Sequence, residues 1–242
     1  MPRLPPAILF DLDDTILSFG RRTDQLAQTA RRLARELEPC PPGEVVAAFD
    51  AANRAFWGDA ERHREWRARP LVQSRRLIAA DAFQTLRARG HGHLSEEIAH
   101  RFGEAFDAHR EAQCGFFPGA CETLDEIRAR GVKMALVTNG LGEVQRAKIT
   151  RFSLEHRFDH IQIEGEHGFG KPEERAYLHA LQALDVEAKD AWMVGDNLEW
   201  EVAAPQRLGI WSIWHDPWGQ GLPEGSPVRP DRIIRSLKEL LD

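Results

Sequence analysis

Five short apolar runs, followed for most of the chain by segments of helical spacing, constrain this sequence more than any other feature. The runs are Ala7–Leu12, Val132–Thr138, His160–Ile163, Ala191–Gly195 and Ile210–Trp214. Runs of this length are typical of buried strands. The helical segments are Gly119–Arg130, Gly142–Arg151, Glu173–Leu184 and Glu199–Leu208. This alternation predicts an α/β fold in which helices cover both faces of a parallel sheet, giving three αβα layers.

A long segment without a clear strand follows the first run and breaks this alternation. It has four helical patterns, at about Arg22–Glu38, Pro42–Trp57, Leu71–Arg89 and Ser95–Glu111. We therefore predict a core domain of residues 1–17 and 117–242, into which residues 18–116 are inserted as a helical domain. The stretch Asp216–Pro230 is rich in Pro and Gly, and we expect a surface loop there before a last helix.

The composition narrows the class of protein. Of the 242 residues, 42% are hydrophobic and 29% are charged, and the net charge is -6, which favours a packed fold and neither a nucleic acid nor an anionic membrane as partner. The cysteines Cys40, Cys114 and Cys121 form no C-x-x-C pair, and no apolar run is long enough for a bilayer. Met1–Pro6 lacks the order of a signal peptide. We expect a cytoplasmic monomer or homodimer.

The strongest chemical signal stands at the end of the first run, in the stretch Phe10–Thr15. Asp11 and Asp13 are two residues apart, so both side chains can face the same side beyond the carboxyl end of a strand, where parallel sheets bind ligands. Two carboxylates this close repel unless a cation lies between them or one holds a proton. A solvated acidic turn is the competing interpretation. Oxygen ligands alone favour Mg²⁺.

Three weaker signals follow later strands. Thr138 and Asn139 end the second strand, where a hydroxyl and free backbone N–H groups can hold an anion. Lys171 precedes a helix and offers a positive charge to phosphate. Asp196 ends the fourth strand, and Glu201 follows it. Each has an ordinary explanation as a cap or turn, but all fall at one edge of the sheet, which favours a common site.

These residues together resemble the haloacid dehalogenase superfamily in its phosphatase branch. Asp11 to Thr15 match the D-x-D-x-T element of the family, Val137–Gly140 the second element, Gly170–Pro172 the third, and Gly195-Asp196 with Glu201 the fourth. The resemblance implies a Rossmann-like, doubly wound parallel sheet and identifies the insertion with the helical cap of the first type. It also implies Mg²⁺-dependent hydrolysis of a small phosphomonoester, for which a nucleotide or a sugar phosphate is an open choice.

The resemblance also implies residue roles. Asp11 is the nucleophile that forms an aspartyl-phosphate, and Asp13 is the general acid and base. Thr138, Asn139 and Lys171 hold the phosphate. Asp11, Asp13 (through its backbone carbonyl) and Asp196 hold the metal.

The sequence leaves several points open. Position 201 is Glu where the family usually has Asp, so that Glu201 either serves the site or faces solvent. A metal-independent dehalogenase, a phosphomutase and a non-catalytic phosphate-binding homologue remain alternatives. His167 is a tempting base but is more simply explained as an incidental loop histidine. In the insertion, Trp57, Arg64, Trp66 and Arg67 either contact substrate or pack between helices. We expect Trp211 and Trp214 to pack in the core.

Overall fold

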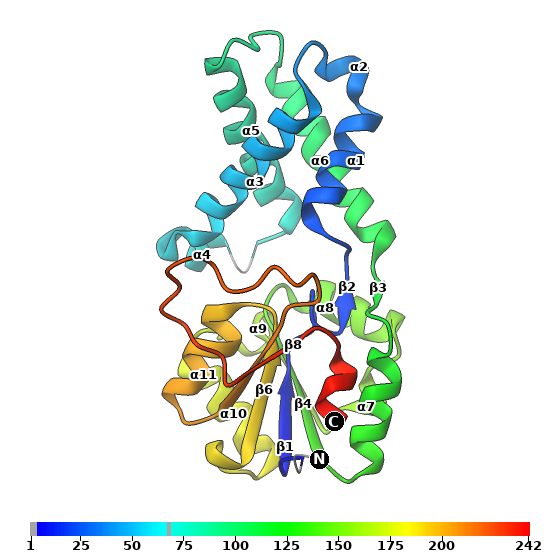
Figure 1. The fold of residues 1–242 in the computed structure, drawn as a ribbon, viewed down its shortest axis with the longest axis vertical. Coiled ribbons are helices and arrows are strands. Elements are labelled where there is room, and N and C mark those ends of the chain that lie inside the picture. Colours follow the sequence, from blue (N-terminus) through cyan, green and yellow to red (C-terminus); the bar gives the residue numbers. More distant parts are fainter. Residues whose placement is uncertain (1–3, 67–68) are drawn as a thin grey trace. The chain divides into compact units, whose positions relative to one another are not determined.

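A computed structural model describes residues 4–66 and 69–242, without the side chains of Ala60, His63 and Arg64. The chain divides into two compact units, one made of Met1–Ser18 with Gly115–Asp242 and the other of Phe19–Cys114. We describe each unit by itself, and Figure 1 labels their helices and strands. No helix within these described ranges combines the length and the apolar character that crossing a membrane requires.

The first unit contains a six-stranded sheet in which every neighbouring pair is parallel. In spatial order its strands are β5 (His160–Ile163), β4 (Lys133–Thr138), β1 (Ala7–Phe10), β6 (Ala191–Gly195), β7 (Trp211–His215) and β8 (Arg232–Ile234). Counted along the chain within this sheet, the order is that of the doubly wound Rossmann fold, with the direction of winding reversing at β1 and β6. The predicted fold class is therefore confirmed.

Helices pack on the sheet through alternate strand residues. Ala7 and Leu9 belong to the apolar cluster that α10 and α11 cover, and α10 supplies Tyr177 to it. Because successive strand residues point to opposite faces, Ile8 and Phe10 point away from that cluster, and the Phe10 ring contacts Phe158. The α-helices of this unit are α7 (Ala120–Ala129), α8 (Gly142–Arg151), α9 (Glu164–His167), α10 (Glu174–Leu184) and α11 (Ala204–Arg207).

Short elements complete the first unit, and most of them escaped the sequence analysis. β2 (Leu17–Ser18) pairs antiparallel with β3 (Gly115–Phe116). These two strands lie where the chain leaves the first unit and where it returns to it. The last predicted helix is instead the 3₁₀ segment η4 (Leu237–Leu241), preceded by β8, and the remaining 3₁₀ segments are η1 (Glu155–Arg157) and η2 (Ala188–Asp190). β8 has only three residues, so pairing with β7 decides its conformation more than its own pattern does.

The second unit is helical, with α1 (Arg22–Arg32), α2 (Ala34–Leu37), α3 (Pro42–Gly58), α4 (Ala60–Trp66), α5 (Leu71–Ala88) and α6 (Glu96–Gln113). The four predicted helical patterns are present, but the first divides into α1 and α2, and α4 was missed. Its core is a cluster of buried aromatic and aliphatic side chains in which Phe102 contacts Phe49 and Phe83, each at 5.6 Å between ring centroids.

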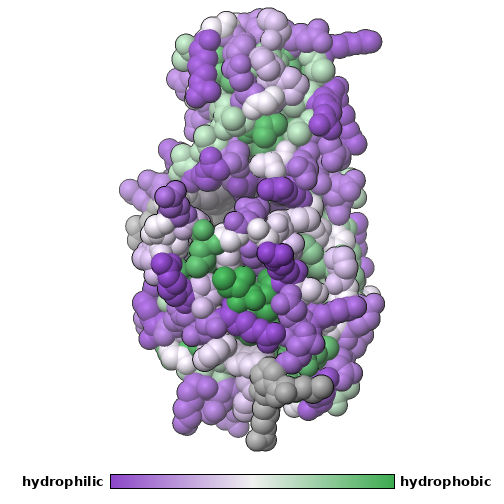
Figure 2. Space-filling view, viewed as in Figure 1, coloured by the Kyte–Doolittle hydropathy of each residue, from purple (hydrophilic) through white to green (hydrophobic). Residues whose placement is uncertain are grey.

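The face of the molecule in Figure 2 is mostly hydrophilic, with hydrophobic residues in separate small groups. Trp214 is buried, as expected, but Trp211 is 48% exposed, so the core position predicted for it is wrong. Trp211 is the first residue of β7, and the four residues that follow it in the strand are all buried, so that only the beginning of the strand is exposed.

Candidate active site

The predicted site residues lie beyond the carboxyl ends of the three central strands. Asp11 directly follows β1, Thr138 is the last residue of β4, and Asp196 directly follows β6. β1 pairs with both β4 and β6, and the Asp11 amide donates to the Val194 carbonyl at 3.0 Å. This is the point where the winding of the sheet reverses, which is the usual position of a ligand site in such folds.

A buried lysine forms the centre of this site. Lys171 is 1% exposed, and its Nζ lies 2.5 Å from Oδ1 of Asp11 and 2.7 Å from Oε1 of Glu201. Burial alone would lower the pKa of Lys171, but the carboxylates of Asp11 and Glu201 outweigh this effect and raise it. The ammonium group is therefore charged at neutral pH and neutralises part of the negative charge of two buried acids.

Lys171 is held in place by the end of the neighbouring strand. The Lys171 amide donates to Oδ1 of Asn139 at 2.9 Å, and Nδ2 of Asn139 donates to the Lys171 carbonyl at 2.6 Å. A Cβ atom on Gly170 would lie 2.6 Å from Oδ1 of Asn139 and 2.7 Å from a carboxylate oxygen of Glu164. Only glycine at position 170 lets the backbone approach Asn139 and Glu164 this closely. The glycine before Lys171 is therefore required for steric reasons.

The structure answers the question that Glu201 raised. Glu201 is 1% exposed, and its second oxygen, Oε2, accepts from the Asn197 amide at 2.7 Å. Burial raises the pKa of Glu201 to about 7, the charge of Asp11 acts in the same direction, and Lys171 opposes both. Glu201 thus contacts Lys171 and does not face solvent.

A local change of helix geometry accommodates this longer acid. The predicted helix after the fourth strand begins as the π-helical segment η3 (Leu198–Ala203), and only its end is the α-helix α11. A Cβ atom on Gly195 would lie 2.0 Å from Cγ of Glu201, so glycine is required beneath the glutamate. The single wide turn and Gly195 together bring a glutamate to Lys171.

The second aspartate of the D-x-D element is held by helix α8. Oδ2 of Asp13 accepts from Lys148 Nζ at 2.6 Å and from Gln145 Nε2 at 3.1 Å. Among the described residues, Oδ1 of Asp13 is buried without a hydrogen-bond partner. One carboxylate oxygen is therefore fixed, and the other remains available to a ligand.

Gln145 also joins Asp13 to the second element. Its Nε2 donates to Oγ1 of Thr138 at 2.5 Å and to the Asn139 carbonyl at 2.9 Å. Gln145 and Lys148 are functional residues that the sequence analysis missed. Their signal was present in the sequence, because they are polar residues three apart, on one side of a helix that follows a site strand.

The structure assigns the cap of the helical segment after β6 to Asn197, which leaves the Asp196 carboxylate for another role. The cap of η3 is Asn197, whose Oδ1 accepts from the amides of Glu199 and Trp200, so capping does not require the Asp196 carboxylate. The Asp196 carbonyl accepts from Nε1 of Trp214 at 2.7 Å. This bond anchors the backbone that carries Asp196.

The donor set fits a divalent cation. Burial raises the pKa of Asp196, and the charges of Glu201 and Asp11 raise it further. Burial also raises the pKa of Asp11, although Lys171 opposes this. Burial and mutual repulsion therefore both disfavour the charged forms of these carboxylates. A cation with oxygen ligands, such as Mg²⁺, would stabilise the charged forms, and Asp11 and Asp196 offer the carboxylates that suit it.

The four sequence elements thus come together at one edge of the sheet. The four residues singled out in the insertion belong to the helical unit. The rings of Trp57 and Trp66 pack around Phe56, at 4.9 and 5.7 Å between centroids. This packing accounts for both tryptophans within the helical unit. Arg67 and the side chain of Arg64 lie outside the described residues, and substrate contact by any of the four stays a prediction.

Comparison with known proteins identifies the family of this chain. The family model of haloacid dehalogenase-like hydrolases matches residues 5–209. Because this match covers most of the chain, the protein belongs to the haloacid dehalogenase-like hydrolases. The family that the four motifs predicted is confirmed.

The curated relatives are phosphatases. Phosphoserine phosphatase of Thermus thermophilus is 37% identical over 145 residues, a match that spans 60% of this chain and 57% of that protein. Ribulose-1,5-bisphosphate 5-phosphatase of Halopiger xanaduensis is 29% identical over 98% of both chains. Pyrimidine 5'-nucleotidase YjjG of Escherichia coli is 25% identical and covers 96% of this chain and 95% of its own. These relatives place the chain in the phosphatase branch of the family.

Solved structures share the fold. The HAD-hydrolase YfnB of Bacillus subtilis, described as bound to magnesium, has a TM-score of 0.68 at 22% identity and covers 98% of this chain and 97% of its own. L-2-haloacid dehalogenase of Xanthobacter autotrophicus has a TM-score of 0.60 at 17% identity, with coverage of 98% and 97%. Because one fold thus serves both phosphatases and dehalogenases, the chemistry has to be argued from the site.

Proposed function

We propose that this protein is a Mg²⁺-dependent phosphatase that hydrolyses a small phosphomonoester through an aspartyl-phosphate on Asp11. The observation that carries the proposal is the fully buried ammonium of Lys171, held between Asp11 and Glu201 at the carboxyl edge of the sheet. An ion pair buried this deeply adds little net stability, so its place in a ligand site points to function.

Charge compensation is the main requirement of the first step. The Asp11 carboxylate attacks phosphorus, and the bond from phosphorus to the leaving oxygen breaks. Two unit charges about 4 Å apart repel by about 4 kcal/mol at an effective dielectric of about 20. Lys171 opposes this repulsion by its contact with Asp11, and bound Mg²⁺ would supply the remaining positive charge. Electrostatic stabilisation then dominates, as in phosphoryl transfer generally.

Asp13 serves as general acid and then as general base. Lys148 and Gln145 fix Oδ2, which leaves Oδ1 to give a proton to the leaving oxygen and later to take one from the attacking water. The Thr138 hydroxyl and the Asn139 amide hold phosphate oxygens, and Gln145 keeps Thr138 in register with Asp13. We further propose that residues 18–116 act as the cap that selects the substrate.

A small phosphomonoester as substrate is supported by the relatives, whose names include a phosphoserine phosphatase, a sugar-phosphate phosphatase and a pyrimidine nucleotidase. The direct test is phosphate release from a panel of these compounds, with Mg²⁺ and with excess EDTA. We expect turnover of at least one small phosphomonoester that EDTA abolishes and added Mg²⁺ restores. Undiminished turnover in EDTA would contradict the proposed metal requirement. Halide release from 2-haloacids without phosphate release would favour the dehalogenase alternative.

A comparison of two carboxylate variants tests the assigned roles. Asp11→Asn removes the nucleophile, so no protein-bound phosphate should form. Asp13→Asn keeps the nucleophile, so an aryl phosphate, whose leaving group needs little protonation, should still react once. Rapid-quench measurement of phenol and of protein-bound phosphate should show a burst near one equivalent with Asp13→Asn only. Equal loss of aryl and alkyl substrates without a burst would show that Asp13 is not the acid and base.

A further inference from the structure

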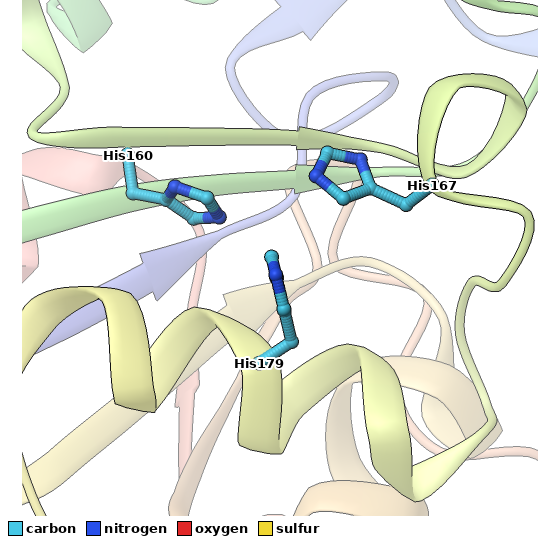
Figure 3. A group of neighbouring side chains, drawn as sticks. All are labelled: His160, His167 and His179. Carbon is cyan, nitrogen blue, oxygen red and sulfur yellow. The ribbon is translucent and has the colours of Figure 1, made fainter.

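Three histidines that belong to none of the four motifs gather beside the edge strand β5 of the sheet. His160 lies on β5, His167 on α9 and His179 on α10. Figure 3 shows their rings pointing toward one another from these three elements. One ring nitrogen of each histidine lies within 4.8 Å of a ring nitrogen of each of the others. The rings are half-buried, so an ion from solvent can reach them.

The hydrogen bonds around two of the rings leave the Nε2 atoms free to bind a cation. Nδ1 of His167 lies 3.1 Å from the Ile163 carbonyl, which can only accept, so Nδ1 carries the proton and Nε2 has the lone pair. Nδ1 of His179 lies 2.8 Å from Oε1 of Gln162, whose Nε2 donates to the Ala176 carbonyl at 2.9 Å. The Gln162 amide is thereby oriented, and His179 has the same tautomer.

His160 completes the set. Its Nε2 is buried and has no hydrogen-bond partner among the residues that the structure describes. A buried polar atom without a partner is costly, and one ring nitrogen of His160 lies within 4.8 Å of a ring nitrogen of each of the other two histidines. Burial lowers the pKa of both His160 and His179, and neighbouring histidines lower it further, although a hydrogen bond with Gln162 opposes this at His160. Neutral imidazole is the form that binds metals.

We propose that His160, His167 and His179 form a binding site for a divalent transition metal ion, with Zn²⁺ as the ion that fits best, distinct from the Mg²⁺ of the active site. Three imidazoles and one water satisfy tetrahedral Zn²⁺, and imidazole prefers Zn²⁺ to Mg²⁺. Ligands about 2.0 Å from Zn²⁺ lie about 3.4 Å apart. The ring nitrogens lie within 4.8 Å of one another, so each pair has to close by at most about 1.4 Å.

Neighbouring groups both favour and oppose the binding of a cation by the three histidines. Nδ1–H groups bonded to a carbonyl or an amide oxygen are the usual support of metal-binding histidines. Arg175, which stacks on Phe169 beside His167 and His179, opposes the ion, because its charge also lowers the pKa of His179. The Glu166 carboxylate acts in the other direction but is paired with Arg146.

Bound zinc would join β5, α9 and α10. α9 ends four residues before Lys171, so the ion would also restrain the segment that leads to the active-site lysine. The other histidine-containing group, Cys40 with Glu44 and His91, is a weaker candidate. Burial raises the pKa of Cys40, which disfavours the thiolate, and Glu44 is already bonded to His91.

The experiment is Zn²⁺ binding to the full chain by equilibrium dialysis in excess Mg²⁺, which keeps the catalytic carboxylates occupied. Wild type should bind one Zn²⁺ and melt at a higher temperature with it. His160→Gln, His167→Gln and His179→Gln should each weaken binding by more than about tenfold, a loss that follows even when a group that only orients a ligand is removed. The control is His156→Gln, which changes an exposed histidine and should bind like wild type.

Co²⁺ gives a second readout that does not depend on activity. Bound to wild type in the same buffer, it should show the visible absorption of a tetrahedral site without a thiolate charge-transfer band, and every triad variant that circular dichroism shows to be folded should lose this spectrum. The proposal is overturned if wild type binds no Zn²⁺ in excess Mg²⁺. It is equally overturned if folded triad variants bind Zn²⁺ as wild type does, because the ion then lies elsewhere.

Discussion

The two units of this protein bury charged side chains in different ways. The sheet unit encloses an ammonium together with two carboxylates, on Lys171, Asp11 and Glu201, each less than 10% exposed. The core of the helical unit contains phenylalanines such as Phe102, and the buried carboxylate of Asp50 pairs there with two arginines whose side chains are 40% and 65% exposed. Burial of charge costs free energy and burial of apolar surface supplies it. The difference therefore separates a region shaped for chemistry from one shaped for stability.

Asp11→Asn should have the largest effect. It should lower activity without lowering stability. We expect phosphatase activity to fall by about 10⁴-fold or more, because the nucleophile is lost. The free energy of unfolding should stay the same or rise, because burial already disfavours the charged form of Asp11. Phosphate release and thermal unfolding check the two halves. A folded state weakened by several kcal/mol would mean that Asp11 is structural.

Phe102→Ala should show the opposite behaviour in the helical unit. Phe102 is fully buried between Phe49 and Phe83, so truncation leaves a cavity and should cost about 4 kcal/mol of unfolding free energy. Urea unfolding measures this loss. The matched control is Phe102→Leu, which keeps most of the volume and should cost much less. Equal losses in the two variants would argue against tight packing around Phe102.

Lys171→Ala should lower kcat/KM by about 3 kcal/mol, comparable to the loss of one preorganised donor. It should also weaken folding, because Asp11 and Glu201 lose their shared counter-charge. The control is Lys189→Ala, which removes an exposed ion pair with Glu187 and should leave both activity and melting temperature unchanged. Activity within threefold of wild type would show that the lysine is misassigned.

The smallest expected effect is a pH dependence of stability that both units share. Burial lowers the pKa of His215 to about 4, although Asp216 and Glu239 oppose this, while the unfolded value is 6.5. Between these values the unfolded chain binds a proton that the folded chain does not, so stability is complete above pH 6.5 and falls as the pH falls. The loss at pH 5.5 is about 1.4 kcal/mol.

His215→Gln should remove that part of the acid sensitivity in urea unfolding at pH 5.5 and 7.5. In the helical unit, burial also lowers the pKa of His109, so His109→Gln should change the pH dependence in the same direction. The exposed His156→Gln should change nothing. An unaltered pH profile in His215→Gln would mean that other groups carry the acid sensitivity.

The architecture and the ends of the strands were predictable because their signals are local. Apolar runs and helical spacing located five of the six strands of the main sheet and the larger helices, and parallel strands necessarily bring their carboxyl ends to one edge. Asp11, Asp13, Thr138 and Asp196 could be placed at that edge for this reason. Three-residue β8 and the π-helical turn η3 could not be placed, because pairing and packing with distant residues determine them.

The sequence by itself determined the family, the sheet and the residues that end its central strands, since hydrophobic period and turn chemistry act over a few residues. The tertiary structure alone decided that Glu201 contacts Lys171, that Lys148 holds Asp13, and that three distant histidines converge beside β5. The physical reason is that a side chain's partners depend on the direction it takes from its backbone and on how elements distant in the sequence pack, and the spacing of residues carries neither.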